Sequence, residues 1–282
     1  MSQAYGSETL RDWQDTAQYW AKYSGIIRTM FAPLTRALIE QAGIRKGQNV
    51  IDVAGGAGEP SLTIAEKVGP TGSVTCTDAV AEMVDAARAE AATRGLTNVQ
   101  FWQCTADSIP FNDESFDAAV SRLGVMFFPD PVAGCREMLR VTKRGGALAF
   151  AVWHKTELNP FSSVVTEIMA RYVEPAPFDP DAPGAFRFAE PGKLSRVMAT
   201  AGATDIKERV IKFDIAAPIS PAQFWEMRSQ TSDTLRQKLT KLSDAQRTQI
   251  AQEVETAVSE FFPRNEMKFP ARMIIVSGHK SV

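Results

Sequence analysis

Residues Asn49 to Ser61, Asn-Val-Ile-Asp-Val-Ala-Gly-Gly-Ala-Gly-Glu-Pro-Ser, combine the signals of a strand, a glycine turn and a helix start. Val50, Ile51 and Val53 form a β-branched run, which suits a parallel strand buried on both faces of a sheet. Pro60 has no N–H group, so it fits the first turn of a helix, where that donor would have no partner. The stretch therefore predicts a strand, a turn and a helix in direct succession.

Three glycines occupy the turn between this strand and this helix. Gly55, Gly56 and Gly58 let the chain turn sharply, and they let a ligand contact bare backbone. Free N–H groups at such a helix start favour a ligand with anionic or hydrogen-bond-accepting groups. A single glycine cluster is also compatible with an ordinary turn, so the order of the following segments decides between a turn and a binding loop.

The following segments have the order of a nucleotide-binding unit. Residues 61–68 are predicted to be helical, and residues 73–77 form a second strand that ends at Asp78. Asp78 lies twenty residues after Gly58. In βαβ units an acid at about that distance accepts hydrogen bonds from the hydroxyls of a ribose. We therefore predict a ribose contact for Asp78, and the alternative is a surface aspartate at a strand end.

The opening stretch resembles motif I of the class I S-adenosylmethionine-dependent methyltransferases, an acid followed by Gly-x-Gly-x-Gly. Asp52 matches the acid, Ala54 takes the place of the first glycine, and Gly56 and Gly58 match the other two. Ala54 adds only a methyl group, so we expect slightly altered loop packing and unimpaired binding. Over residues 46–153 the resemblance is to the methyltransferase type 11 and ubiquinone/menaquinone C-methyltransferase-like group.

This resemblance implies an α/β fold with a Rossmann-like, doubly wound sheet of seven strands. The sheet is expected to be mostly parallel with its last strand antiparallel, accompanied by N-terminal helices and helical lid insertions. A single methyltransferase domain is expected over residues 1–282. Its expected parts are an N-terminal helical cap (1–45), a cofactor-binding core (46–153), lid insertions (155–188 and 215–269) and the end of the sheet (189–214 and 270–278).

The resemblance also implies S-adenosylmethionine as cofactor and S-adenosylhomocysteine as its product. Asp107 matches an acid that binds the exocyclic amine of adenine, beside a backbone N–H that binds a ring nitrogen. The alternative for Asp107 is a turn aspartate before Pro110. Met83 is predicted to cover the adenine face or to be plain core. The complete expected set of cofactor contacts is Asp52, Ala54, Gly55, Gly56, Gly58, Asp78, Ala79, Met83, Ala106, Asp107, Ser108 and Ser121.

Methyl transfer from a sulfonium is an in-line displacement at carbon, in which the protein mainly aligns the reacting atoms and excludes water. A base helps when the acceptor is a phenol or an activated carbon acid. His154, just after the fifth predicted strand, is the candidate base or acceptor-orienting group, since histidine titrates near neutrality. Its alternative is a solvated loop histidine. Arg122 is predicted to bind an acidic acceptor group or to stabilise an enolate or phenolate, and its alternative is a salt bridge to Asp78 or a place beside the cofactor.

Residues 9–24 place aromatic and apolar side chains at helical spacing, and a second helical stretch follows up to Gly43. Both stretches are predicted to pack on the core, and the aromatic residues of the first also suit a lid. Helical stretches are further predicted at residues 161–172, 190–201, 221–228, 231–242 and 245–262. The aromatic residues predicted to form a pocket for a flat acceptor are Tyr19, Trp20, Tyr23, Phe127 and Trp153.

Composition narrows the possible partners. Of the 282 residues, 44% are hydrophobic and 23% are charged, as in soluble globular proteins. The net charge of −2 creates no basic field for nucleic acid, and no apolar stretch approaches the length of a membrane span. The first residues lack the features of a signal peptide. Cys76, Cys104 and Cys135 lack metal-ligand spacing, so we expect no metal, reduced thiols and a cytoplasmic location.

The favoured interpretation is methyl transfer to a small apolar or aromatic molecule, of quinol, phenol or natural-product type, at carbon or oxygen. One alternative is a protein that binds S-adenosylmethionine without transferring its methyl group. Another is a nicotinamide-dependent oxidoreductase. Ser61 argues against this alternative, because it occupies the position at which the dinucleotide-binding fingerprint requires a third glycine. The methylated element and the choice between monomer and homodimer stay open at this point.

Overall fold

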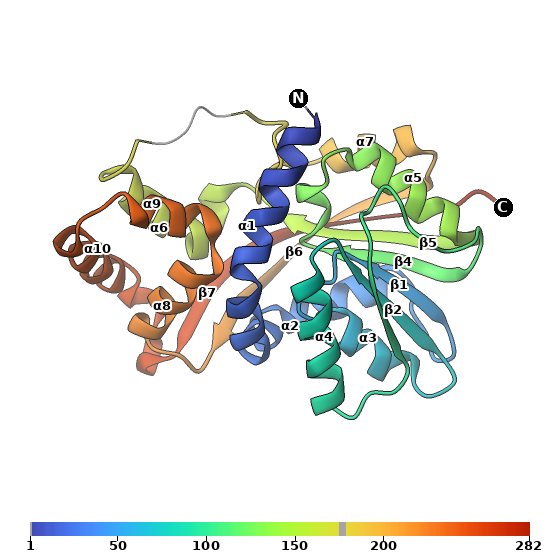
Figure 1. Ribbon diagram of the computed structural model, residues 1–282, viewed down its shortest axis with the longest axis horizontal. Coiled ribbons are helices and arrows are strands. Elements are labelled where there is room, and N and C mark those ends of the chain that lie inside the picture. Colours follow the sequence, from blue (N-terminus) through green and yellow to red (C-terminus); the bar gives the residue numbers. More distant parts are fainter. Residues whose placement is uncertain (1, 175–178) are drawn as a thin grey trace.

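A single sheet of seven strands runs through the computed structural model, with helices packed against it (Figure 1). The structure describes residues 2–174 and 179–282, and it describes side chains from residue 10 onward within those ranges. The strand order is β3-β2-β1-β4-β5-β7-β6. The strands are β1 (Asn49–Val53), β2 (Ser73–Asp78), β3 (Val99–Gln103), β4 (Phe116–Arg122), β5 (Thr142–Trp153), β6 (Thr204–Ala217) and β7 (Met267–His279).

Strand β7 runs antiparallel to both of its neighbours, β5 and β6, whereas the remaining pairs are parallel. The expected Rossmann-like sheet with an antiparallel last strand is therefore confirmed. The chain first moves outward from β1 to β3 and then returns to β4. Since parallel crossovers are right-handed, this reversal places the helices before and after it on opposite faces of the sheet. The reversal between β1 and β4 is where such sheets bind ligands.

Ten α-helices and four short 3₁₀ helices connect the strands within the described residues. The α-helices are α1 (Ser2–Lys22), α2 (Ser24–Gln41), α3 (Ser61–Val68), α4 (Ala81–Thr93), α5 (Pro131–Val141), α6 (Pro160–Ala170), α7 (Lys193–Ala201), α8 (Pro221–Thr231), α9 (Asp233–Thr240) and α10 (Asp244–Ala257). The 3₁₀ helices are η1 (Val125–Phe127), η2 (Thr156–Leu158), η3 (Ser259–Phe261) and η4 (Pro263–Asn265).

Side-chain caps explain where several helices begin. The Asp130 carboxylate accepts hydrogen bonds from the N–H groups of Val132 and Ala133 at 2.9 Å each, and α5 starts there. Ser243 and Gln246 form a reciprocal capping box at the start of α10. Such caps satisfy backbone donors that the first helical turn leaves unpaired. Local sequence therefore sets these helix starts.

The fifth strand differs from the prediction at its beginning. The sequence of residues 143–146, Lys-Arg-Gly-Gly, predicts a turn before a strand over residues 147–153, but these four residues belong to β5. Gly145 donates its N–H to the Lys280 carbonyl at 3.0 Å, and Lys280 donates to the Gly146 carbonyl at 3.0 Å. The segment after β7 thus supplies hydrogen-bond partners that a turn would lack. Strands β6 and β7 also pair over a long stretch, in register from Lys207 with Ser277 to Ala217 with Met267, with a register shift between Thr204 and Lys207.

The central core consists of the inner strands and the helices that cover them. Val50, Ile51 and Val120 are fully buried between neighbouring strands. Leu34 and Leu38 of α2 are also fully buried, and α2 packs against β5, β6 and β7. A helix long and apolar enough to cross a membrane does not occur in the described part of the chain.

Helices α8 to α10 form the insertion between β6 and β7. These helices, coloured orange to red in Figure 1, contact α1 and α6. Helix α1 crosses in front of the sheet and contacts α4 on one side and α8 and α9 on the other. Of the first expected lid insertion, residues 175–178 lie outside the described residues. We propose that the chain is divided into the expected cofactor-binding core and lid insertions.

Candidate functional site

A cavity of about 510 Å³ lies at the carboxyl ends of β1, β2 and β4. Its volume is within the range of ligand pockets, ~300–1,000 Å³. One side, here called the strand-end wall, comes from residues 53–59, 78–83, 104–107 and 122–130. The other side, called the helical wall, consists of side chains from the first two helices: Leu10, Trp13, Trp20, Ser24, Ile27 and Phe31. The cavity therefore occupies the point where the strand order reverses, which is the usual ligand site of open α/β sheets.

Close packing explains the glycines of the loop after β1. A Cβ atom at Gly55 would lie 2.7 Å from Cys76 Sγ and 2.9 Å from Asp52 Oδ2. Gly56 and Gly58 have φ values of 56° and 110°, and Ala54 has a φ of 58°. Ala54 therefore holds a left-handed backbone that glycine adopts at lower cost. The replacement in the glycine motif changes backbone strain as well as packing.

The glycine-loop N–H groups are already used inside the protein. Gly55 donates to the Thr77 carbonyl at 2.9 Å, and Gly56 donates to Asp78 Oδ2 at 2.9 Å. Gly58 donates to the Gly55 carbonyl at 3.1 Å. The expectation of free donors is therefore wrong for these three groups. An anionic part of a ligand needs a donor from elsewhere in the cavity.

Asp52 lies beneath the loop and does not reach the cavity. The side chain is fully buried, Oδ2 accepts a hydrogen bond from the Ser61 hydroxyl at 2.6 Å, and Oδ1 has no protein partner. Burial raises the pKa of Asp52 to about 7, because the charged carboxylate loses hydration, and the hydrogen bond from Ser61 only partly opposes this effect. The acid that matches the motif therefore supports the loop from below.

Asp78 lines the cavity at the end of β2. Its Oδ2 accepts from Gly56 N–H at 2.9 Å and its Oδ1 accepts from Val80 N–H at 3.0 Å. Burial raises the pKa of this carboxyl, and the backbone hydrogen bonds from Val80 and Gly56 oppose the rise. A carboxylate has about four acceptor sites. Asp78 thus retains acceptor capacity for hydroxyl groups after holding the loop.

The other residues expected to contact the cofactor divide into two groups. Those that line the cavity are Ala54, Gly55, Gly56, Ala79, Met83, Ala106 and Asp107. Gly58, Ser108 and Ser121 do not line it, and Ser121 is fully buried with its hydroxyl oxygen unpaired. Met83 combines both predicted alternatives, since it lines the cavity, is only 2% exposed and packs beside Ala17 and Val80.

The prediction of the aromatic residues that line the pocket is only partly correct. Trp20 and Phe127 line the cavity, but Tyr19, Tyr23 and Trp153 do not. The Tyr23 hydroxyl bonds to Gln230 Oε1 at 2.9 Å, and the Tyr19 ring packs against the Arg236 guanidinium. Trp153 is 7% exposed, with its ring centroid 6.1 Å from that of Phe161 in a stacked arrangement. These three rings contact side chains of α8, α9 and α6 instead of the cavity.

Trp13, Phe31 and Phe128 complete the aromatic lining, and neither Trp13 nor Phe31 was predicted to contribute to the pocket. The Trp13 ring lies 4.9 Å from the Phe127 ring, edge to face, and 5.6 Å from the Trp20 ring. Trp13 and Trp20 are separated by two helical turns, so they share one face of α1. That spacing was the available signal for Trp13. Phe31 lies on α2, and only the packing of that helix brings it to the cavity.

His154 lies away from the cavity, contrary to the prediction. The imidazole is 8% exposed, and its Nδ1 accepts the N–H of Lys155 at 2.8 Å. The backbone N–H of His154 donates to the Arg272 carbonyl, and its carbonyl accepts from Asn159 Nδ2. The residue follows Trp153, the last residue of β5 that pairs with β7, whereas the cavity lies at the ends of β1, β2 and β4. This position does not support a role as catalytic base.

Arg122 lines the cavity and is 8% exposed. Its Nη1 donates to Thr35 Oγ1 at 2.7 Å, its Nη2 donates to the Glu59 carbonyl at 3.1 Å, and its Nε has no protein partner. The guanidinium carbon lies 5.6 Å from the centroid of the Phe31 ring. The alternative salt bridge to Asp78 does not form. Burial lowers the pKa of Arg122, and the negative charges of Glu59 and Asp52 oppose this effect.

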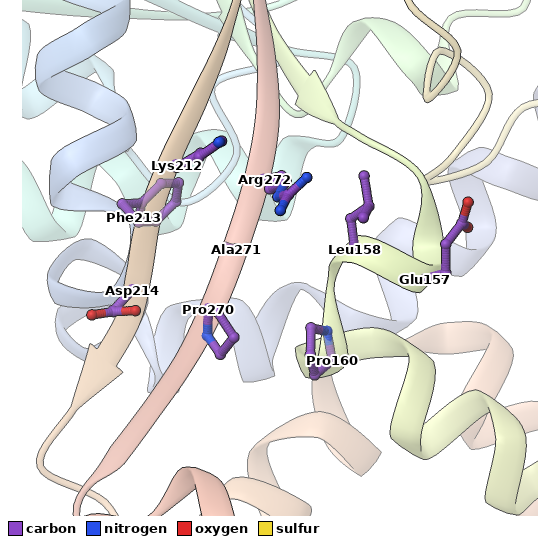
Figure 2. Close-up of a pocket in the computed structure, with 9 residues that line it drawn as sticks. All are labelled: Glu157, Leu158, Pro160, Lys212, Phe213, Asp214, Pro270, Ala271 and Arg272. Carbon is purple, nitrogen blue, oxygen red and sulfur yellow. The ribbon is translucent and has the colours of Figure 1, made fainter.

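Figure 2 shows a second hollow, of about 580 Å³, between the β6–β7 pair and the segment from η2 to the start of α6. Two cations, Lys212 and Arg272, and two carboxylates, Glu157 and Asp214, line it. The glycine loop and the strand-end acids do not contribute to it. We therefore place the candidate site in the cavity at the end of β1, although the second hollow is slightly larger.

The residues of the first cavity fit S-adenosylmethionine. Asp78 and Asp107 provide carboxylate acceptors for the hydroxyls and the amine of an adenosine. Met83 and Ala79 provide apolar contacts beside them. The unpaired Nε of Arg122 provides a buried donor on the same cavity. These groups match a ligand that carries a nucleoside, a carboxylate and an apolar chain.

Comparisons with known proteins agree with this fit. The chain is 40% identical over 136 residues to an uncharacterised protein of Mycobacterium tuberculosis, a match that covers 48% of each chain. It is 34% identical over 130 residues to the ubiquinone/menaquinone biosynthesis C-methyltransferase UbiE of Pasteurella multocida, covering 46% of this chain and 48% of that protein. The matches thus span about half the length of these relatives.

The fold is shared with the YcgJ protein of Bacillus subtilis, with a TM-score of 0.55 and 23% identity over 88% of this chain and 98% of that one. The model of the ubiE/COQ5 methyltransferase family matches residues 30–176, which is more than half of the chain. This range contains the glycine loop and the strand-end acids that line the cavity. The chain therefore belongs to the ubiE/COQ5 methyltransferase family, a class I group whose methyl donor is S-adenosylmethionine.

Proposed function

We propose that this protein transfers a methyl group from S-adenosylmethionine to a small apolar or aromatic acceptor, of quinol, phenol or natural-product type, at carbon or oxygen. The observation that carries the proposal is that strand-end acids and aromatic rings line one and the same cavity. Acids suit the polar cofactor, and rings suit a flat acceptor. A cavity with both linings can bring a methyl donor and its acceptor together.

The cofactor supplies a methyl group that is already activated by the positive charge on sulfur. In this proposal Asp78 accepts hydrogen bonds from the ribose hydroxyls, while Asp107 accepts one from the adenine amine. The loop after β1 holds Asp78 in place through the Gly56 N–H. Because the carboxylate is bonded to the loop on one side and open to the cavity on the other, ligand binding and loop conformation are coupled.

The acceptor side of the proposed site consists of Trp13, Trp20, Phe31 and Phe127. Offset and edge-to-face ring contacts suit a planar acceptor, and apolar rings exclude water from the transfer step. We propose that α1 acts as a lid, together with the insertions that contain α6 and α8 to α10. Trp20 Nε1 donates to the Thr231 carbonyl at 3.1 Å, which links α1 to α8. Closure of this lid aligns the acceptor with the methyl group.

Quinols are the first acceptors to test, since the relative from Pasteurella multocida is named a ubiquinone/menaquinone biosynthesis C-methyltransferase. Helix α1 and helices α8 to α10 lie outside the matched residues 30–176, so the family match does not extend to Trp13 and Trp20 of the acceptor side. We also propose a cytoplasmic location and a small-molecule partner in place of nucleic acid, in keeping with the net charge of −2.

Isothermal calorimetry of the purified protein tests the proposal. S-adenosylmethionine and S-adenosylhomocysteine are expected to bind at micromolar concentrations, and NAD(H) is expected not to bind. An acceptor screen with a labelled methyl donor, beginning with quinols and phenols, then identifies the product. Binding of NAD(H) alone would contradict the proposal in favour of an oxidoreductase. Binding of the donor without transfer to any member of the panel would favour a binding protein.

A further inference from the structure

Arg122 is an unusual residue in this cavity. Among the cavity-lining residues, all of which belong to the described part of the chain, Arg122 is the only cation, alongside the carboxylates Glu59, Asp78, Asp107 and Asp130. Glu59 is engaged elsewhere, because its Oε1 pairs with Arg94 at 2.6 Å and its Oε2 accepts from Thr63 at 2.7 Å. The cavity thus offers a single positive group to a ligand.

No ion pair within the described residues neutralises this guanidinium, although the charges of Glu59 and Asp52 lie near enough to act on it. Its two hydrogen bonds go to neutral acceptors, the Thr35 hydroxyl and the Glu59 carbonyl. Burying a charge without a paired counter-charge is costly. A bound anion at the unpaired Nε would remove that cost, and Thr35 and Phe31 already hold the guanidinium on the cavity wall.

The position of Arg122 along the sheet indicates which anionic group of a ligand it contacts. Asp107 follows β3, Asp78 ends β2, the glycine loop follows β1, and Arg122 ends β4, in the spatial order of these strands. A nucleoside between Asp107 and Asp78 therefore directs its 5′ substituent past β1 toward Arg122. The loop N–H groups of Gly55, Gly56 and Gly58 are bonded within the protein, so they do not compete for that substituent.

We propose that Arg122 binds the carboxylate of the methionine part of the cofactor. This inference rests on the proposed function, because it requires S-adenosylmethionine in the cavity. The carboxylate is the only anionic group of that cofactor, and Arg122 is the only lining cation. The residue is thereby assigned to cofactor binding and positioning of the methyl group, in place of the predicted contact with an acidic acceptor.

The test measures the dissociation constants of S-adenosylhomocysteine and of its decarboxylated analogue, which keeps the ammonium group and lacks only the carboxylate. Wild-type protein is expected to bind the parent about 10–100-fold more tightly, as a lost charged hydrogen bond implies. In Arg122→Met this preference is expected to fall to about threefold or less. The affinity for the decarboxylated analogue should change little, and this value also shows that the variant is folded.

Arg228→Met is the matched control. Arg228 also has an unpaired, buried Nε, it stacks on Phe161 at 4.7 Å, and it does not line the cavity. Its replacement should leave the ligand preference unchanged. Arg122→Lys, which keeps the charge, should retain part of the preference and protects the test if the methionine variant fails to fold.

The outcomes separate this inference from the proposed function. An unchanged preference in Arg122→Met, with or without a raised KM for the acceptor, would overturn the carboxylate assignment and leave the methyltransferase proposal standing. Equal loss of affinity for both ligands would also overturn it, because the carboxylate would not be the group that Arg122 recognises. Failure of wild-type protein to bind either ligand would overturn the use of the cofactor and the assignment together.

Discussion

The two walls of the cavity are held in place by different interactions. In the strand-end wall, Asp78 is fixed by two backbone N–H groups, and the glycine loop is bonded to neighbouring strands. In the helical wall, Trp20 is held by one side-chain hydrogen bond to Thr231, 211 residues away in the sequence, and by ring contacts. The strand-end wall is therefore part of the sheet, whereas the helical wall depends on a few long-range side-chain contacts. Substitutions in the two walls should have separable effects.

The largest effect is expected from Asp52→Asn, beneath the strand-end wall. The folded pKa of about 7 exceeds the unfolded value, so folding favours the protonated acid. This stability is present below about pH 4 and is lost as the pH rises through 7. About two of the roughly three pKa units of this shift titrate between pH 5 and pH 8, so at 1.36 kcal/mol per unit the variant should gain ~2.6 kcal/mol of unfolding free energy relative to wild type across that range.

Chemical denaturation at several pH values measures this difference. Asn keeps an oxygen that can accept from Ser61, so the variant preserves the hydrogen bond. Asp85→Asn is the control, since Asp85 is 71% exposed and pairs only with Arg88 on the surface of α4. Parallel stability curves for wild type and Asp52→Asn across this pH range would show that Asp52 is ionised in the folded protein at all of these pH values.

The next effect is expected from Asp78→Ala, in the strand-end wall itself. The variant loses the proposed ribose contacts as well as the acceptors of Gly56 and Val80. Affinity for S-adenosylhomocysteine should fall by about 1–3 kcal/mol, roughly 5–150-fold, because charged hydrogen bonds are lost. Calorimetry measures this change, with Asp85→Ala as the surface control. Unchanged affinity would reject the ribose assignment.

A smaller effect is expected in the helical wall from Trp20→Phe. The substitution keeps an aromatic ring, but it removes the indole N–H that donates to Thr231 and part of the ring that packs against Trp13. The lost hydrogen bond lowers the unfolding free energy by about 0.5–1.5 kcal/mol, and the smaller ring adds to this fall. Stopped-flow measurement should also show faster release of S-adenosylhomocysteine with a looser lid. If release is as slow as in wild type, the link between α1 and α8 does not control access to the cavity.

The smallest effect is expected from Ala54→Gly, which restores glycine to the motif. Ala54 holds a φ of 58°, where an alanine is strained by ~1–2 kcal/mol. Glycine removes this strain but loses more backbone entropy on folding, so a net gain of about 1 kcal/mol or less is expected. Ala57→Gly is the control, because Ala57 is not among the residues with positive φ and should lose stability instead. Thermal denaturation compares the two variants, and a loss in Ala54→Gly would argue against strain at this position.

Short-range patterns were sufficient for the central part of the sheet. The sequence predicts a helix over residues 61–68, a strand over 116–122 and a helix over 131–141, and α3, β4 and α5 have these bounds, while β1 lies within the opening stretch. Each of these elements has its own hydrophobic run and its own start or stop signal, such as Pro60 or Asp130. Where an acid ends a parallel strand, its position at the ligand edge follows from the topology. Asp78 was therefore placed on the cavity without knowledge of any tertiary contact, whereas Asp107 was placed there by the family resemblance.

The sequence by itself determined the fold class, the strand-end acids and the glycine loop, because these depend on residues close together in the chain. Only the tertiary structure decided which side chains form the helical wall. Trp153 and Tyr23 contact other side chains away from the cavity, whereas Trp13 and Phe31 line the cavity. It also decided that β5 begins at Thr142, where Lys280 supplies the hydrogen bonds, and that His154 lies elsewhere. The physical reason is that a ring or a backbone group faces whichever partner packing brings near, and those partners come from distant parts of the chain.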